Sequence, residues 1–327
     1  MRNPTQVLEA FSQQVGDTPM HRITNGSASG TIWAKCEWHN PTGSVKDRAA
    51  VAMVSEVLRQ HDDLASLHIL EYSGGNLGLS LATICHMMGV KLTLVLSASS
   101  PLSLLNKLHA LGAQVELVDV SEGFGGVIQH AITMAKDNSD YTFLYQHRNP
   151  ANVRAHTDGT GAEILKQMSG RRIDAWIAAA GSGGTLAGVY DALSRVFPDV
   201  ALHMVMPTEM PYGTPVPANP KKRFAGSGGL GKGIKQHFLE VREPHITSEW
   251  NFSYEETLHT MQIFLEETGI RIGTSAAANL LAAQKVATQL GPQANVVTIF
   301  PDRGSPEEWA DANALTLDDV RPVIREI

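Results

Sequence analysis

The sequence is short of cysteine, of long apolar runs and of clustered basic charge. Cys36 and Cys85 are the only two cysteines in 327 residues and form no CxxC pair, so we expect two small buried side chains in a reducing compartment. No apolar run approaches the roughly 20 residues that a transmembrane helix requires. The polar stretch 1–14 lacks the apolar core of a signal peptide. Together these features predict a cytoplasmic protein with no membrane partner.

The net charge and the spacing of the histidines argue against nucleic-acid binding and a metal site. The net charge is −7, and the densest basic run, KKR at 221–223, is most simply a solvated loop, so no nucleic-acid partner is expected. The 13 histidines form no HExxH or comparable spacing, and no metal site is predicted. Hydrophobic residues make up 43% of the chain and charged residues 18%, a balance typical of a globular protein with a large core.

Short β-branched runs alternate with helical patterns through most of the chain. We expect strands at 67–72, 91–97, 114–120, 142–146, 174–180, 201–207 and 295–301. Helices are expected between them, for example at 76–89, 101–112 and 125–137. Because this alternation builds βαβ units, the predicted fold class is α/β, with parallel-type sheets flanked by helices. The Pro- and Gly-rich stretch 207–234 is predicted to be a functional loop or lid.

Lys46 occupies an unusual place for a lysine, within NPTGSVKDR at 40–48. Ser44 and Asp47 have the spacing of a capping box, which predicts a helix that starts here. Lys46 would then lie in the first turn, where the helix dipole disfavours a positive charge. An exposed lysine at a helix end is the ordinary interpretation. The alternative is an amine whose ammonium form is disfavoured, as suits a nucleophile that attacks an aldehyde.

A Gly-rich turn at 178–188 follows the expected strand 174–180 and leads into a helix. Glycine lets the backbone approach an anion, and hydroxyl donors at the positive end of a helix add to its binding. The turn therefore suits a phosphate group, held by Gly181, Ser182, Gly183, Gly184 and Thr185.

The kind of phosphate ligand stays open from the residues alone. A dinucleotide fingerprint would need a third glycine where Leu186 stands, although Glu209 ends the next strand much as a ribose-binding acid would. The sequence has no GxxxxGK, which excludes a P-loop. A tight turn with a purely structural role is the remaining alternative.

Two further polar turns follow expected strands. Residues 71–78, EYSGGNLG, offer several backbone N–H groups and a side-chain amide, a cradle that suits a carboxylate. The residues concerned are Ser73, Gly74, Gly75 and Asn76, and a plain helix start is the alternative. In the turn at 299–304, Asp302 and Arg303 are interpreted most simply as a pair with each other.

A lysine for an aldehyde, a glycine cup for a phosphate and a cradle for a carboxylate together describe pyridoxal phosphate with an amino acid. Over nearly its whole length the chain resembles the cysteine synthase and cystathionine β-synthase family, the fold-type II pyridoxal-phosphate enzymes of the tryptophan synthase β-like superfamily. The motifs that carry the resemblance occur in the family's order. They are GDTPM (16–20), NPTGSVKDR (40–48), YSGGNLG (72–78), YQHRNPAN (145–152), GSGGT (181–185), GTSAAA (273–278) and IFPDRG (299–304).

The resemblance implies a role for each matching residue. Lys46 would form the internal Schiff base and move the α-proton, and the segment Gly181 to Thr185 would hold the phosphate. Asn76 would bond the 3′-oxygen of the ring and Ser275 would face the pyridine nitrogen. The substrate carboxylate would be held by Ser73, Gly74, Gly75, Asn76 and Gln146.

The reaction implied is β-replacement on an O-activated L-serine, either O-acetylserine or O-phosphoserine, through an α-aminoacrylate. A small nucleophile would be the second substrate. Ser73 and Gly74 replace the family's Thr-Ser, and Leu77 resembles the branch that makes diaminopropionate-type products, so the sequence does not name the nucleophile. Arg148 is interpreted either as an attractant for an anionic substrate or as an ordinary exposed arginine.

Other functions stay open at this stage. A dehydratase or desulfhydrase would stop at β-elimination. A nucleotide-binding oxidoreductase would use the turn at 178–188 for a dinucleotide. A pyridoxal-phosphate binder without catalysis is also conceivable, but the intact Lys46 argues against it.

The resemblance also implies two entwined domains with the cofactor in the cleft between them. The smaller would comprise 41–148, and the larger 1–40 together with 149–327. A homodimer is implied by the resemblance alone.

Overall fold

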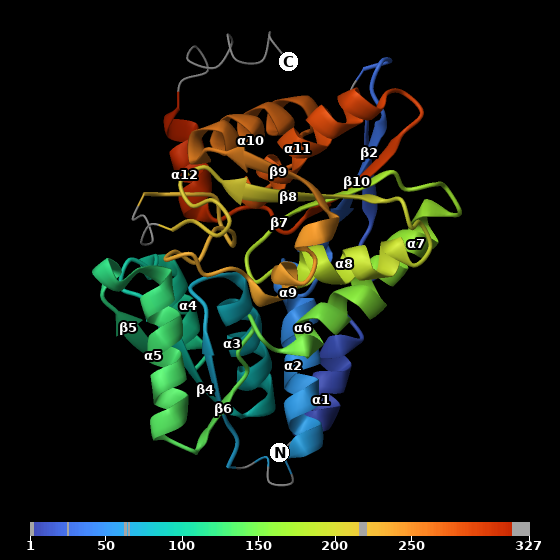
Figure 1. The fold of residues 1–327 in the computed structure, drawn as a ribbon. Helices are drawn as coiled ribbons and strands as arrows, with labels where there is room; N and C mark the ends of the chain where they lie inside the picture. The colour runs from blue at the N-terminus through green and yellow to red at the C-terminus, as the bar shows by residue number, and fades with distance from the viewer. Residues whose placement is uncertain (1–2, 25, 62–63, 65, 216–220, 316–327) are drawn as a thin grey trace.

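The computed structural model describes residues 3–24, 26–61, 64, 66–215 and 221–315, which form two sheets with helices packed on both faces (Figure 1). All strand pairs of the described chain except the first are parallel. The α/β class with parallel-type sheets flanked by helices is therefore confirmed.

The larger sheet has six strands in the order β1-β2-β10-β7-β8-β9. In that order they are Met20–Thr24, Thr31–Cys36, Asn295–Phe300, Ala175–Ala179, Ala201–Pro207 and Ile246–Phe252. Strand β10 pairs in parallel with both β2 and β7. The carboxyl ends of these strands therefore lie at one edge of the sheet, where ligands bind in open α/β folds.

Helices cover both faces of this sheet (Figure 1). One face packs against α10 (Tyr254–Thr268), α11 (Thr274–Leu290) and α12 (Pro306–Ala314), with a core that includes Phe264, Phe300 and Trp309. The other face packs against α7 (Ala162–Met168), α8 (Gly184–Ser194) and α9 (His237–Glu240), with a core around Trp176 and Leu202. The strands β10, β7 and β8 are almost fully buried, as expected for a parallel sheet, whereas the edge strands β1 and β9 are partly exposed.

The smaller sheet has four parallel strands in the order β5-β4-β3-β6. They are Gln114–Val118, Lys91–Ser97, His68–Tyr72 and Tyr141–Phe143. Helices α2 (Lys46–Gln60), α3 (Asn76–Met88) and α4 (Leu102–Ala110) share one core with this sheet, and α5 (Gly123–Asp137) covers the other face. The turn after β3 and the first residue of α2 thus belong to the same layer.

The N-terminal helix α1 (Pro4–Ser12) packs on α2 and α3 of the smaller sheet, although β1 and β2 belong to the larger one. The chain therefore passes between the two layers more than once. It returns from β6 through α6 (Pro150–Arg154) and a π-helical stretch, Ala155–Gly161, into α7. The domain division at 41–148 stays a prediction.

The expected strands and helices occur close to the predicted bounds. Helix α3 ends at Gly89, whose φ of 69° is left-handed, as a terminating glycine should be. The strand expected at 114–120 ends at Val118, because a short 3₁₀ turn, Val120–Glu122, follows it. The sequence did not reveal β1, β2 or β9 of the larger sheet.

The stretch 207–234, of which 216–220 lie outside the described residues, is tied to the end of β7. The Gly228 N–H donates to the carbonyl of Ala180 at 3.1 Å, and the Gly229 N–H donates to Met210 at 2.7 Å. The Ala225 N–H donates to Thr274 Oγ1 at 2.9 Å. The described part of this stretch therefore forms a wall beside the Gly-rich turn.

Candidate active site

Lys46 is the first residue of α2, and its amine forms no hydrogen bond or ion pair with any described residue. The surrounding protein lowers the pKa of this amine by burial, while the charges of Asp302 and Glu37 act in the opposite direction. An amine without a protein partner and with a lowered pKa is suited to attack on an aldehyde. Of the two interpretations offered by the sequence, the exposed lysine is excluded.

The capping box predicted at Ser44 is wrong. Helix α2 begins after Val45 without a side-chain cap, and the Asp47 carboxylate turns back instead. It accepts hydrogen bonds from the Thr42 N–H at 2.7 Å and from Ser80 Oγ at 2.6 Å. Asp47 therefore holds the turn that presents Lys46 and ties α2 to α3.

The Gly-rich turn after β7 is closely packed from three sides. A β-carbon at Gly181 would clash with the carbonyl of Gly226, and one at Gly184 would clash with the Asn152 side chain. Gly183, at the start of α8, has a φ of 85°, which a residue with a β-carbon rarely adopts. Three glycines are thus required by the shape of the turn itself.

The same turn carries unpaired backbone donors. Within the described chain the N–H groups of Ser182, Gly183 and Thr185 form no hydrogen bond, and they lie at the N-terminus of α8. Free N–H groups at a positive helix end form an anion site. The turn therefore fits the phosphate of pyridoxal phosphate.

Two residues that the sequence did not single out support this cup. Asn152 Nδ2 donates to Ser182 Oγ at 3.0 Å and to the carbonyl of Gln146 at 2.9 Å. His156, fully buried in the π-helical stretch, lies 3.1 Å from Thr185 Oγ1 through Nε2. Burial lowers the pKa of His156 well below its usual range, with the charges of Arg48 and Lys46 acting in the same direction. It therefore serves as a neutral partner of the threonine.

The predicted carboxylate cradle lies between β3 and α3. Ser73 Oγ accepts a hydrogen bond from the Gly78 N–H, in the first turn of α3, at 3.1 Å. Gly74, between them in the chain, is exposed. Asn76 Nδ2 donates to Asp302 Oδ2 at 2.7 Å. The cradle is thus joined to the turn after β10.

The suggested pairing of Asp302 with Arg303 is wrong. Asp302 Oδ1 accepts from the Gly304 N–H at 2.9 Å, while the Arg303 guanidinium lies over the Trp38 ring, 5.2 Å from its centroid. Burial raises the pKa of Asp302, against the hydrogen bonds of Gly304 and Asn76 and the charge of Lys46. A carboxyl group that the sequence paired with Arg303 therefore contacts Asn76 of the predicted site instead.

Gln146 and Ser275 complete the predicted set. Gln146 Nε2 donates to the carbonyl of Tyr72 at 2.8 Å, and its N–H donates to Glu71 Oε2 at 3.2 Å. Ser275 is buried in the first turn of α11, two residues after Gly273, where a β-carbon would clash with Asp302. Both lie beside the other predicted residues, and their contacts with ligands stay predictions.

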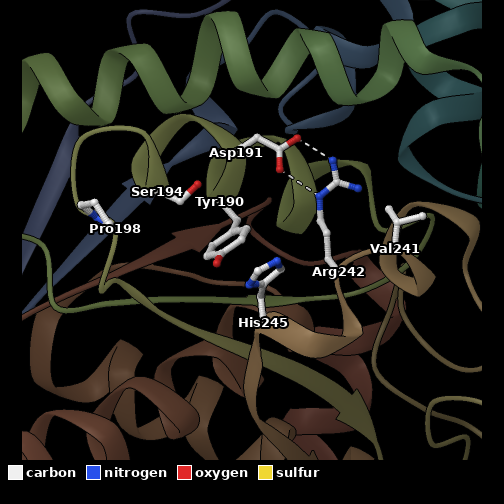
Figure 2. A pocket seen from close by; sticks show the side chains of 7 residues that line it. All are labelled: Tyr190, Asp191, Ser194, Pro198, Val241, Arg242 and His245. Carbon is white, nitrogen blue, oxygen red and sulfur yellow. Dashed lines mark hydrogen bonds and ion pairs between the residues drawn. The ribbon is translucent and has the colours of Figure 1, made fainter.

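A cavity of about 450 Å³ lies against the C-terminal half of α8 (Figure 2). Arg242 reaches across it to Asp191, with Nε–Oδ1 at 2.9 Å, so its charge is already paired. The lining residues are Tyr190, Asp191, Ser194, Pro198, Val241, Arg242 and His245, none of which belongs to the predicted site. The chemistry therefore lies with Lys46 and not in this cavity.

The fold and the site define a pyridoxal-phosphate-dependent enzyme. The family model described as "Pyridoxal-phosphate dependent enzyme" matches residues 11–302. A cysteine synthase of Staphylococcus aureus (strain N315) is 30% identical over 95% of this chain and 98% of its own. A probable cysteine synthase of Bacillus subtilis (strain 168) is 32% identical over 91% of this chain and 96% of its own.

Solved structures agree with the sequence comparisons. The O-acetylserine-dependent cystathionine β-synthase from Helicobacter pylori has a TM-score of 0.80 and 28% identity, covering 90% of this chain and 95% of its own. The chain belongs to the cysteine synthase and cystathionine β-synthase family, and pyridoxal phosphate is its cofactor.

In the described ranges no group of three or more His, Cys, Asp or Glu side chains is arranged to hold a metal ion. No helix among the described residues has the length and apolar character needed to cross a bilayer.

Proposed function

We propose that this enzyme replaces the β-substituent of an O-activated L-serine, O-acetylserine or O-phosphoserine, with a small nucleophile. One observation carries the proposal: the enclosed Lys46 amine has no protein partner in the described chain and shares its surroundings with Asp302. Membership of the cysteine synthase family supports the reaction type, and the H. pylori neighbour is described as O-acetylserine-dependent.

When bound, pyridoxal phosphate supplies an aldehyde that captures an amine and a ring that withdraws electrons from the adjacent carbon. Lys46 Nζ would hold the cofactor and, once displaced by the substrate amine, would accept the proton from the substrate Cα. The N–H groups of Ser182, Gly183 and Thr185 would hold the phosphate against the start of α8.

The remaining predicted residues position the substrate and the ring. The N–H groups of Ser73 to Asn76, with Gln146, would hold the substrate carboxylate. Ser275 would meet the pyridine nitrogen with a hydroxyl, which, unlike a carboxylate, does not keep that nitrogen protonated. A ring without that proton withdraws electrons less strongly, which favours rapid departure of the β-substituent over storage of negative charge at Cα.

Assembly and location are further parts of the proposal. We place the chain in a homodimer, to be tested by light scattering on the purified protein. We also place it in the cytoplasm, because Cys36 and Cys85 are both free and buried, as thiols are in reducing compartments.

The test of the proposed function compares products from several donors. Purified holoenzyme is incubated with O-acetylserine or O-phosphoserine, first with sulfide and then with small amines. Cysteine or a β-amino-alanine as product supports β-replacement and identifies the nucleophile. Pyruvate alone would assign a dehydratase or desulfhydrase instead. Colourless protein that binds a dinucleotide would assign an oxidoreductase.

A further inference from the structure

Tyr72 and His147 form a buried hydrogen-bonded pair next to two predicted substrate-binding residues. Tyr72 Oη lies 2.6 Å from His147 Nδ1, and the two rings stack with centroids 5.5 Å apart and planes 22° from parallel. Tyr72 directly precedes Ser73 in the carboxylate cradle, and His147 directly follows Gln146. The pair therefore connects two segments that face the same ligand.

The surroundings fix both rings in place. Tyr72 is fully buried at the end of β3, and 6% of His147 is exposed. The ring of Phe124 packs edge-on against Tyr72 at 6.0 Å and lies 5.9 Å from His147. Closely packed aromatic rings of this kind hold a polar group in a single orientation.

The hydrogen bond also sets the proton positions. Burial raises the pKa of Tyr72, so the phenol keeps its proton, and the His147 backbone N–H also approaches the phenol oxygen. Burial lowers the pKa of His147 to about 3, helped by the charge of Lys46, so the imidazole is neutral. The phenol proton therefore points to Nδ1, and the imidazole carries its own proton on Nε2.

The Nε2–H group has no partner in the protein. It forms no hydrogen bond within the described chain, and it is not among the fully buried polar atoms that lack one. It therefore opens onto accessible space, on a ring whose neighbours in the chain and across the hydrogen bond are the predicted substrate-binding residues Gln146 and Ser73. The carboxylate, the amine and the proton on the substrate Cα already have assigned partners in the proposed function. The oxygen on Cβ does not.

We infer that His147, oriented by Tyr72, is a specificity-determining residue whose Nε2–H donates a hydrogen bond to the oxygen on Cβ of the donor amino acid. The inference rests on the proposed function, which supplies such a substrate. As the Cβ–O bond breaks, its electron pair moves to that oxygen. A neutral donor stabilises the growing charge there without repelling the Lys46 ammonium, whereas an imidazolium would.

The test measures binding without turnover. Spectral titration of the holoenzyme with L-serine, which carries the β-oxygen, and with L-alanine, which lacks it, gives the preference for that oxygen. In His147→Phe this preference should fall roughly three- to tenfold, the effect of one hydrogen bond, with L-alanine affinity unchanged. His147→Gln, whose Nε2 donor replaces that of the ring, should keep most of the preference, and His147→Asn should not.

The role of Tyr72 is tested in the same titration. Tyr72→Phe should lower the preference by a smaller factor, and the double variant should match His147→Phe, because Tyr72 acts through His147. Tyr145→Phe, which removes a phenol from a ring 6.3 Å from Tyr72, is the matched control and should change nothing. Unchanged cofactor spectra and melting temperatures identify the variants as folded.

Two outcomes overturn the inference. One is an equal loss of L-serine and L-alanine affinity in folded His147→Phe and His147→Asn, and the other is an unaltered preference in both. Failure of the proposed function looks different, because the wild-type enzyme would then show the preference for the β-oxygen yet release no β-replacement product. The titration therefore tests the role of His147, and the product assay separately tests the proposed function.

Discussion

Asn76 donates a hydrogen bond from Nδ2 to Asp302 Oδ2 at 2.7 Å, and the bond joins the two sheets of the molecule. Asn76 begins α3 in the smaller layer, whereas Asp302 follows β10 in the larger one. The negative charge of Asp302 also raises the pKa of Lys46, against the effect of burial. One carboxyl group therefore acts on both the contact between the two layers and the Lys46 amine.

Asp302→Asn should lower the pKa of Lys46, because the charge that supports its ammonium form is removed. In apoenzyme, the pH at which cofactor uptake reaches half its maximal rate should then fall, since the free amine is the reacting form. Stopped-flow absorbance across the pH range measures this. Asp311→Asn, which removes a half-buried acid paired with Lys222, is the control and should leave the pH dependence of cofactor uptake unchanged. An unaltered profile in Asp302→Asn would contradict the assigned coupling.

Gly181→Ala and Gly184→Ala should each weaken cofactor binding by tenfold or more, a change of about 1.4 kcal/mol or larger. A β-carbon at either position meets Gly226 or Asn152, so the cup must shift. Equilibrium dialysis of pyridoxal phosphate gives the dissociation constant.

Gly125→Ala is the control for these two variants. This glycine lies inside α5, where a β-carbon would meet its nearest neighbour at an ordinary 3.5 Å. It should keep cofactor affinity and gain about 0.5–1 kcal/mol of stability from the lower entropy of the unfolded chain. Equal loss of affinity in all three variants would contradict the assignment of the cup.

Glu163→Gln should destabilise the protein by about 3–5 kcal/mol near neutral pH, because it leaves the buried Lys35 ammonium without its carboxylate and Arg48 with Glu37 alone. Glu163 lies 2.7 Å from Arg48 Nη1 through Oε1 and 2.7 Å from Lys35 Nζ through Oε2. The comparison is Glu56→Gln, whose partner Arg154 is exposed, and its cost should stay below about 1 kcal/mol. Urea unfolding measures both.

The contribution of Glu163 should also depend on pH. Burial alone would raise its pKa, but hydrogen bonds and charge from Arg48 and Lys35 lower it to about 2. The stabilisation is therefore complete above the unfolded-state value of about 4.3 and is lost as the pH falls toward 2. The difference in free energy of unfolding between wild type and Glu163→Gln should become smaller as the pH falls from about 4.3 toward 2. A constant difference would show that the carboxylate charge is not what stabilises the fold.

Glu71 should give the opposite pH dependence. Burial raises its pKa to about 8, against hydrogen bonds from Tyr72 and Gln146, so the folded protein binds a proton that the unfolded chain has released. Stability from this group is greatest below about pH 4.3 and falls as the pH rises toward 8. Glu71→Gln, which stays neutral, should remove that decline in urea unfolding at a series of pH values. A decline that persists unchanged in the variant would contradict the raised pKa.

The parts of the site that the sequence predicted are those set by short-range signals. A glycine-rich turn between a strand and a helix is visible in neighbouring letters, and so is a lysine after a turn. The Asn76–Asp302 bond could not be predicted, because the two residues are 226 positions apart and each has several plausible partners. Asn152 was missed for the same reason, since its role depends on where β7 ends relative to α6.

The buried strands β7, β8 and β10 were predicted from their apolar runs, whereas β2 was missed although it lies between β1 and β10, and β1 was missed with it. Strand β9, Ile246–Phe252, was missed because it lies at the sheet edge and alternates polar and apolar residues, including Glu249 and Asn251. An edge strand tolerates polar side chains that a central strand excludes. The capping box predicted at Ser44 does not form for a different reason, because the Asp47 carboxylate accepts hydrogen bonds from Thr42 and Ser80 instead.

The carbonyl of Gly226 fills the volume that any side chain at position 181 would need. The residue types allowed in the turn at 178–188 therefore depend on the position of the 207–234 wall, although strand β8 separates the two segments in the chain. An insertion that moved residue 226 away would make alanine or serine acceptable at 181, and a larger residue at 181 would survive only in a lineage that had first rebuilt the 207–234 wall.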